Sequence, residues 1–146
     1  MVNSLRPMPK TRKDFQRLAQ LRAIEAALLA KGRKEQGAYY LGGFAIECAL
    51  KACIAKSTRK HEFPDKDRVN KSYTHSLVEL IRLAGLRETH DARMKSDPAF
   101  RDNWLIVVSW SEDSRYLRNT AEKAQGLVNA VGNPKSGILA WLRHYW

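Results

Sequence analysis

The hydrophobic positions of this chain repeat with the period of α-helices. Within residues 11–31, apolar side chains recur every three or four positions, at Phe15, Leu18, Leu21, Ile24 and Leu28. This spacing predicts an amphipathic helix that ends at Gly32. A second segment, 35–56, is apolar on nearly every face. That pattern is typical of the central helix of a bundle.

Capping signals predict where the later helices begin. Ser76 followed by Glu79 matches a capping box, and the apolar run behind it stops at Gly85. Asp97 before Pro98 is an N-cap residue with proline at the first helical position, which begins another helix. Two further helices are predicted at 120–131 and 138–145, and a polar loop at 57–72.

The helical periods extend through most of the chain, and no segment alternates apolar and polar residues as a half-buried strand would. We therefore predict an all-α fold, an antiparallel up-and-down helical bundle of about five to six helices. Residues 1–146 are the length of a single domain. Within that domain we expect residues 1–10 to form a flexible basic N-terminus.

Basic residues strongly outnumber acidic ones, with 26 Lys and Arg against 15 Asp and Glu, a net charge of +11 and a pI near 10.0. Such a surplus favours polyanionic partners, although a basic surface without a ligand has the same balance. The first 34 residues carry nine Lys and Arg against two acidic residues, and a second basic cluster lies at 56–71. Together with this cluster, four cations of the first helix are candidates for weak, sequence-independent nucleic-acid binding: Arg12, Lys13, Arg17 and Arg22.

The cysteines and the longest apolar stretch both favour a cytoplasmic protein. Cys48 and Cys53 lie five residues apart in one predicted helix, beyond the reach of a disulfide, and reduced thiols fit the cytoplasm. Residues 37–55 are nearly long enough to span a bilayer. Glu47 and Lys51 would each cost about 2.5–3.5 kcal/mol near the bilayer centre, more than the apolar neighbours return. We expect a buried core helix and no membrane association.

Four segments, in the same order along the chain, resemble a widespread group of bacterial HEPN-domain proteins. The most specific of them reads AYYLGGFAIECALK, and the segments lie at 38–51, 73–77 with 83–86, 103–116 and 137–142. The resemblance implies an antiparallel helical bundle that commonly forms a homodimer. It also implies a role in nucleotide or RNA biology, often beside a nucleotidyltransferase-like protein partner in toxin–antitoxin or defence systems.

Catalytically active members of that superfamily carry an Arg, four to six residues and then a His near the start of a late helix, where a dimer cuts RNA. The late segment of this chain has Arg115 and Arg118, but no His follows before His144. Arg68 and His75 have the required spacing but straddle an earlier loop, and one such pair is expected by chance. We therefore assign no catalytic residue.

Glu47 and Lys51 lie four residues apart in the order that favours a helical ion pair. Such a pair fits the edge of a helix or a dimer seam, and equally a polar pocket inside the bundle, where a buried charge pair is costly unless it has a use. His75 precedes a predicted helix, where it either caps the turn or points into a pocket.

Trp110, Arg115 and Tyr116 are the strongest candidates for a ligand site. An Arg can bind a phosphate through two hydrogen bonds, and a neighbouring aromatic ring can stack on a base. The alternative is that both aromatic rings are core residues and Arg115 pairs with Glu112 or Asp113.

We expect neither a metal nor a cofactor. Four potential oxygen and nitrogen ligands lie in the polar loop, but no second His or Cys follows at ligand spacing: His61, Glu62, Asp65 and Asp67.

The sequence thus predicts a non-catalytic HEPN-like protein that binds a nucleotide, RNA or a protein partner. The alternatives are a metal-independent ribonuclease toxin and an oligomerisation or adaptor module without a ligand. We expect a homodimer, because 38–55 is apolar around more of its circumference than a small bundle usually covers.

Overall fold

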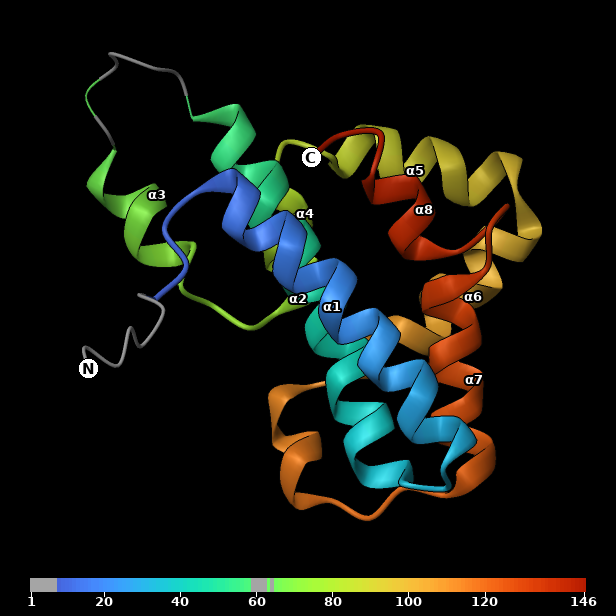
Figure 1. The fold of residues 1–146 in the computed structure, drawn as a ribbon. Coiled ribbons are helices and arrows are strands. Elements are labelled where there is room, and N and C mark those ends of the chain that lie inside the picture. The colour runs from blue at the N-terminus through green and yellow to red at the C-terminus, as the bar shows by residue number, and fades with distance from the viewer. Residues whose placement is uncertain (1–7, 59–62, 64) are drawn as a thin grey trace, which may run out of the picture.

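Helices make up all the regular structure in the described part of a computed structural model, which covers residues 8–58, 63 and 65–146. The all-α helical bundle is therefore confirmed, and the described residues form eight α-helices and one 3-10 helix where about five to six helices were predicted. The predicted flexible N-terminus lies mostly outside these residues, as do His61 and Glu62. In chain order the helices are α1 Arg12–Lys31, α2 Glu35–Ser57, α3 Lys66–Lys71, α4 Leu77–Leu83, α5 Arg87–Ser96, α6 Pro98–Val108, the 3-10 helix η1 Glu112–Tyr116, α7 Ala121–Gly132 and α8 Ile138–Leu142 (Figure 1).

Helices α1 and α2 form an antiparallel hairpin (Figure 1). A full capping box begins α1, in which the Thr11 side chain accepts from the Asp14 N–H and Asp14 accepts from the Thr11 N–H. The link to α2 is short. Its Arg33 has a positive φ of 57°, the left-handed conformation that reverses the chain after Gly32.

Helix α2 is the centre of the bundle, as its apolar circumference predicts. Most of its residues are buried beneath α1, α4, α7, α8 and η1. It is long and apolar enough to cross a membrane, but most of that stretch is buried inside the fold. Two glycines let neighbours approach closely: a Cβ on Gly42 would lie 3.3 Å from Leu127, and one on Gly43 would lie 2.2 Å from the Trp110 ring.

The position of α1 follows the prediction, but its apolar stripe is not its buried face. The helix buries Ala19 and Ala26, whereas Leu21, Ile24 and Leu28 are 43%, 59% and 62% exposed. Ala26 lies against the backbone of Gly42. Because small residues let the two helices pack closely, α1 turns its larger apolar side chains outward.

Helix α5 does not appear among the sequence predictions, and its only buried residue is His90. This ring lies edge-on to three aromatic side chains, with centroid distances of 4.5 Å to Trp104, 5.7 Å to Trp141 and 5.9 Å to Phe100. A histidine thus takes the core position of an apolar residue, and burial lowers its pKa despite the opposing effect of Asp91.

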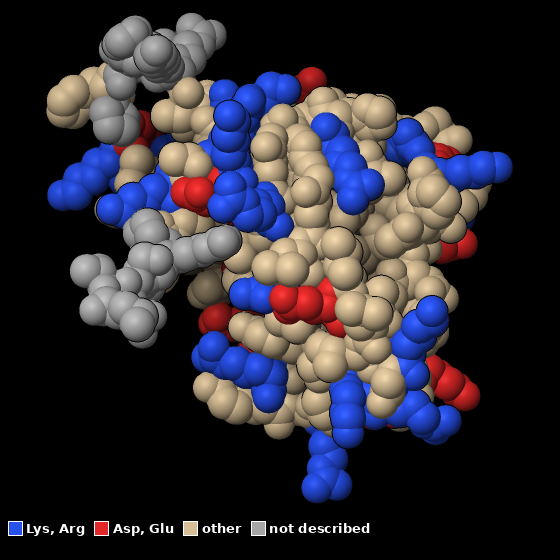
Figure 2. All heavy atoms as spheres, viewed as in Figure 1, with Lys and Arg blue, Asp and Glu red and all other residues tan. Residues whose placement is uncertain are grey.

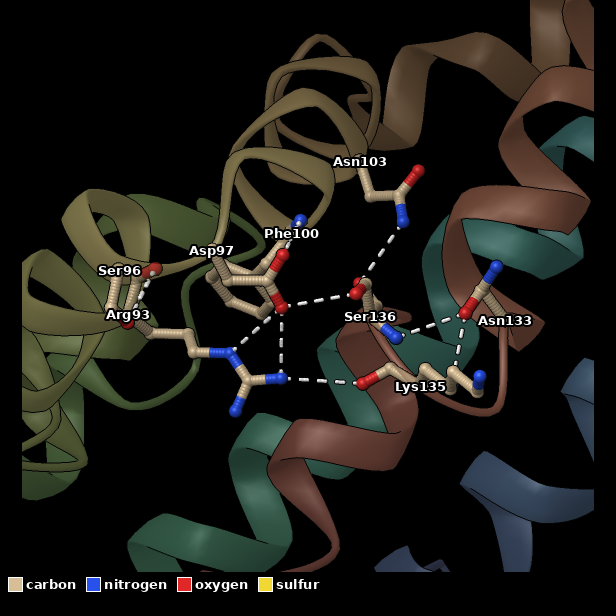
Figure 3. Close-up of polar contacts among 8 residues, drawn as sticks. All are labelled: Arg93, Ser96, Asp97, Phe100, Asn103, Asn133, Lys135 and Ser136. Carbon is tan, nitrogen blue, oxygen red and sulfur yellow. Dashed lines mark hydrogen bonds and ion pairs between the residues drawn. The ribbon is translucent and has the colours of Figure 1, made fainter.

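A polar network around Asp97 joins the α5–α6 corner to the link between α7 and α8 (Figure 3). Asp97 caps α6 by accepting from the Phe100 N–H at 3.0 Å. Its other oxygen accepts from the side chains of Arg93 and Ser136. Asn103 donates in turn to the Ser136 carbonyl at 3.0 Å. The predicted N-cap is therefore confirmed and also holds two distant corners together.

Candidate functional site

Three segments that are distant in sequence meet at His75. The Nδ1 atom of His75 lies 2.6 Å from Oε1 of Glu47 on α2, and its Nε2 atom lies 3.0 Å from Oε2 of Glu112 at the start of η1. The Glu47 side chain is 2% exposed, whereas that of His75 is 45% exposed. The imidazole therefore connects a core carboxylate to a surface carboxylate.

Each ring nitrogen of His75 therefore faces a carboxylate oxygen, one from the core and one from the surface. Lys51 places a cation beside the same buried group, with its Nζ atom 3.8 Å from the other oxygen of Glu47. A buried carboxylate is stable only with such partners. Glu47 and Lys51 thus form the helical ion pair that their spacing predicts, with the Glu47 side chain buried and the Lys51 side chain 16% exposed.

An open hollow of about 460 Å³ lies beside this network. His75, Trp110 and Glu112 all line it, so two predicted site residues share one wall. Six further residues near the start of α4 and the end of α6 complete the lining: Thr74, Ser76, Leu77, Val78, Val108 and Ser111.

Trp110 is a core residue, as the alternative interpretation holds. It is 4% exposed, packs against the backbone of Gly43, and its ring centroid lies 6.2 Å from that of Tyr40. Among the described residues, its indole N–H has no hydrogen-bond partner. Trp110 therefore forms a wall of the hollow and cannot offer a free face for stacking.

Arg115 and Tyr116, by contrast, lie open on η1. The Arg115 guanidinium carbon lies 4.8 Å from the centroid of the Tyr116 ring, and Tyr116 is 75% exposed. The nearby Tyr116 holds the pKa of Arg115 above its usual range, and Glu112 acts in the same direction. Side chains three residues apart eclipse in a 3-10 helix, which places Arg115 on the same side of η1 as Glu112.

The four α1 cations that are candidates for nucleic-acid binding have different surroundings. Arg22 forms two hydrogen bonds to Glu25, at 2.8 and 2.9 Å. Arg12, Lys13 and Arg17 are exposed. On the face shown in Figure 2, Lys and Arg gather near the two ends of α1, and the surface over its middle is largely of other residues. Part of the second basic cluster, 56–71, lies outside the described residues.

Arg68 and His75 have separate partners. The Arg68 guanidinium donates to the Leu83 carbonyl at 3.3 Å and to the Ser57 hydroxyl. His75 is held between Glu47 and Glu112. The Arg and His that match the ribonuclease spacing are thus each bound to other groups.

The residues considered for a metal are used locally where they are described. Asp65 caps α3 through the Asp67 N–H, and Asp67 pairs with Lys71 at 2.8 Å. Within the part of the chain that the structure describes, no three His, Cys, Asp or Glu side chains form a group suited to a metal ion.

Glu112 is the site residue that sequence reasoning missed, because it was considered only as a partner for Arg115. A signal is present, since Glu112 lies two residues after Trp110 and three before Arg115, both of which are candidate site residues. Its pairing with His75 depends on the fold and cannot be read from spacing.

Comparisons with protein-family models, with curated proteins and with solved structures found no match for this chain.

Proposed function

We propose that this chain binds RNA or a nucleotide at η1 and does not cut it. The observation that carries the proposal is the Arg115–Tyr116 pair, an exposed aromatic ring beside an exposed guanidinium. A base can stack on the ring while the guanidinium binds the adjoining phosphate. The HEPN resemblance supports the same class of ligand.

The anchoring of η1 favours a preformed site. Glu112 at its first turn binds His75, which in turn binds the buried Glu47. This chain of contacts holds the segment that carries Arg115 against the core. A site whose groups are already in place loses less conformational entropy on binding.

The hollow beside Glu112 favours a ribose over a deoxyribose. Its polar lining includes the carboxylate of Glu112 and the hydroxyl of Ser111, which accept hydrogen bonds from sugar hydroxyls. The 2′-hydroxyl is the group that distinguishes RNA from DNA at a protein site. We therefore expect single-stranded RNA to bind more tightly than DNA of the same sequence.

The state of the two candidate catalytic groups supports binding without cleavage. Both nitrogens of His75 bind carboxylates, and the Arg68 guanidinium binds Ser57 and Leu83. A general acid–base group must reach the reacting proton, and the two groups would have to leave these partners to act together.

Fluorescence anisotropy with a labelled single-stranded RNA tests this site. Base stacking contributes about 1–3 kcal/mol, so Tyr116→Ala should weaken binding about 5- to 150-fold. Tyr116→Phe should retain most of the affinity, and Arg115→Ala should lose it. Arg101→Ala, an exposed arginine at the opposite end of α6, is the matched control. Equal affinity of all four variants would refute the η1 site.

The same preparation tests the ribonuclease alternative. Intact RNA after incubation with the wild type is the expected result. Cleavage that disappears in both Arg68→Ala and His75→Ala would replace the proposal with a metal-independent ribonuclease.

We also propose a homodimer and a nucleotidyltransferase-like partner, as the resemblance implies, in a toxin–antitoxin or defence setting. Most of the apolar circumference of α2, on which the expectation of a dimer rests, is covered by the same chain, and Tyr40, Leu41 and Phe44 remain half-buried. Sedimentation at tens of micromolar tests for the dimer.

A further inference from the structure

Helix α1 presents an exposed apolar face that its own bundle does not cover. Leu21, Ile24 and Leu28 are 43%, 59% and 62% exposed. Their spacing of three and four residues places them in one row along the helix. Single exposed apolar residues are ordinary, but a row of three on one helix face indicates a binding surface.

Cations lie at both ends of this row on the same face. Lys13 and Arg17 precede Leu21 at intervals of four, and Lys31 follows Leu28 at an interval of three. All three are exposed, and none pairs with an acidic residue among those the structure describes. The helix therefore reads, along one face, as two cations, three apolar side chains and one cation.

The acidic residues of α1 form no ion pair with the cations of this face among the described residues, although Asp14 attracts Arg17 electrostatically. Asp14 accepts hydrogen bonds from the backbone at the helix start, and those bonds hold its pKa below the usual value. Glu25 is bound to Arg22. The charge of the exposed face thus remains available to a partner.

A groove extends the apolar row toward the N-terminus. It has a volume of about 650 Å³ and is lined by Met8 and Pro9 from the segment before α1 and by five residues of α1: Asp14, Arg17, Leu18, Leu21 and Arg22. Its lining thus combines apolar side chains with two cations and one carboxylate. A partly apolar groove beside a row of side chains spaced by three or four residues has the shape that an amphipathic helix fills.

We propose that this face of α1 is a docking surface for an acidic amphipathic helix of another protein. Charge complementarity identifies the partner: apolar residues spaced by three and four should meet Leu21, Ile24 and Leu28, with carboxylates at both ends opposite the cations. The span from Lys13 to Lys31 is about 27 Å at the helical rise, which requires a helix of about five turns.

Charge also excludes a second copy of α1 as the best occupant. If two copies of α1 packed antiparallel through this face, Lys13 and Arg17 of one copy would lie against Lys31 of the other. Paired parallel, each cation would meet its own counterpart. Both arrangements juxtapose like charges, which disfavours association. A nucleic acid fits less well, because the apolar row separates the cations that would follow its phosphates.

A synthetic helical peptide of about 20 residues tests the surface, with leucines at the matching spacing and glutamates at both ends. Titration calorimetry at low salt should detect its binding to the wild-type protein. Ile24→Asp should weaken binding about tenfold or more. The triple variant Lys13→Glu, Arg17→Glu and Lys31→Glu should lose the acidic peptide and gain one with lysines at both ends. Arg101→Glu, a charge reversal at an exposed position on α6, should alter neither.

Three results would overturn the proposal. The first is the same affinity for the acidic and basic peptides. The second is a dimer of the wild type that Ile24→Asp dissociates, which would make a second copy the occupant. The third is failure of the peptide to bind while Ile24-dependent binding to anionic phosphatidylserine vesicles is observed, which would make the face a membrane contact. Circular dichroism of each variant establishes that loss of binding is not loss of the fold.

Discussion

Replacing Gly43 by alanine tests the packing that forms the wall of the candidate site. A Cβ at this position would lie 2.2–2.3 Å from three ring atoms of Trp110, well inside any real contact distance. The ring is 4% exposed and packs near Tyr40, so it has little room to move.

Two opposing effects set the magnitude. Overpacking of a well-packed core costs about 1–3 kcal/mol. Alanine in the interior of a helix is favoured over glycine by about 0.5–1 kcal/mol. We therefore expect a net loss of roughly 1–2 kcal/mol in the free energy of unfolding, or a melting temperature lower by about 2–8 °C for a chain of this size.

Gly126→Ala is the matched control, because Gly126 lies within α7 and a Cβ there meets no atom within 4 Å. This variant should be more stable than the wild type, by up to about 1 kcal/mol. Urea unfolding followed by far-UV circular dichroism measures both without depending on Trp110 fluorescence. If Gly43→Ala gains as much stability as Gly126→Ala, Trp110 does not lie against α2 and the hollow beside His75 is misplaced.

Three further predictions concern buried groups. Glu47→Ala should lower the free energy of unfolding by roughly 3 kcal/mol, because it leaves His75 and Lys51 without a buried partner. Glu112→Ala, at a half-exposed position, should lower it by about 1 kcal/mol or less. Because the pKa of His90 is lowered in the folded state, the unfolded chain takes up a proton at this residue at a higher pH than the folded chain does. The free energy of unfolding should therefore fall as the pH drops below 6.5. His90→Gln should reduce this dependence on pH, measured by urea titrations at pH 5 to 8. Burial raises the pKa of both Cys48 and Cys53 to about 12, so neither thiol should react with a disulfide reagent at neutral pH until urea unfolds the protein, and rapid labelling of either thiol in the folded state would contradict this placement.

Most helices could be predicted from local chemistry. Asp97 with Pro98 and Ser76 with its downstream apolar run begin helices where their capping patterns indicate. Helix α5 could not be predicted this way, because His90 fills its one buried position and the ten residues carry no apolar period. The short α3 lies in a segment read as a polar loop, and it buries no residue at all.

The orientation of α1 shows where hydrophobic periodicity fails. Periodicity marks Leu21, Ile24 and Leu28 as one face, and they do form one face, but it points outward. The buried face instead contains Ala19 and Ala26, which carry little hydrophobic signal and are selected by close approach to α2. The close packing of α1 against α2 therefore decides which face is buried, even though the opposite face carries the larger apolar side chains.

The candidate site was predicted in parts but not as a unit. The sequence marks Glu47 and His75 as charged or titratable residues in unusual surroundings. It also marks Arg115 as a group that can bind a phosphate and Tyr116 as a ring that can stack on a base. Their connection through Glu112 arises from three segments that meet only in the folded chain. No local spacing encodes contacts over such sequence separations.

The most direct test of the RNA-binding proposal is a titration of isotope-labelled protein with single-stranded RNA, followed by amide chemical shifts. The proposal predicts that the largest shifts occur in η1, at Arg115 and Tyr116, with smaller ones at His75 across the hollow. Binding that leaves the η1 amides unshifted while resonances elsewhere move, or no shift at any site at low salt, would contradict it.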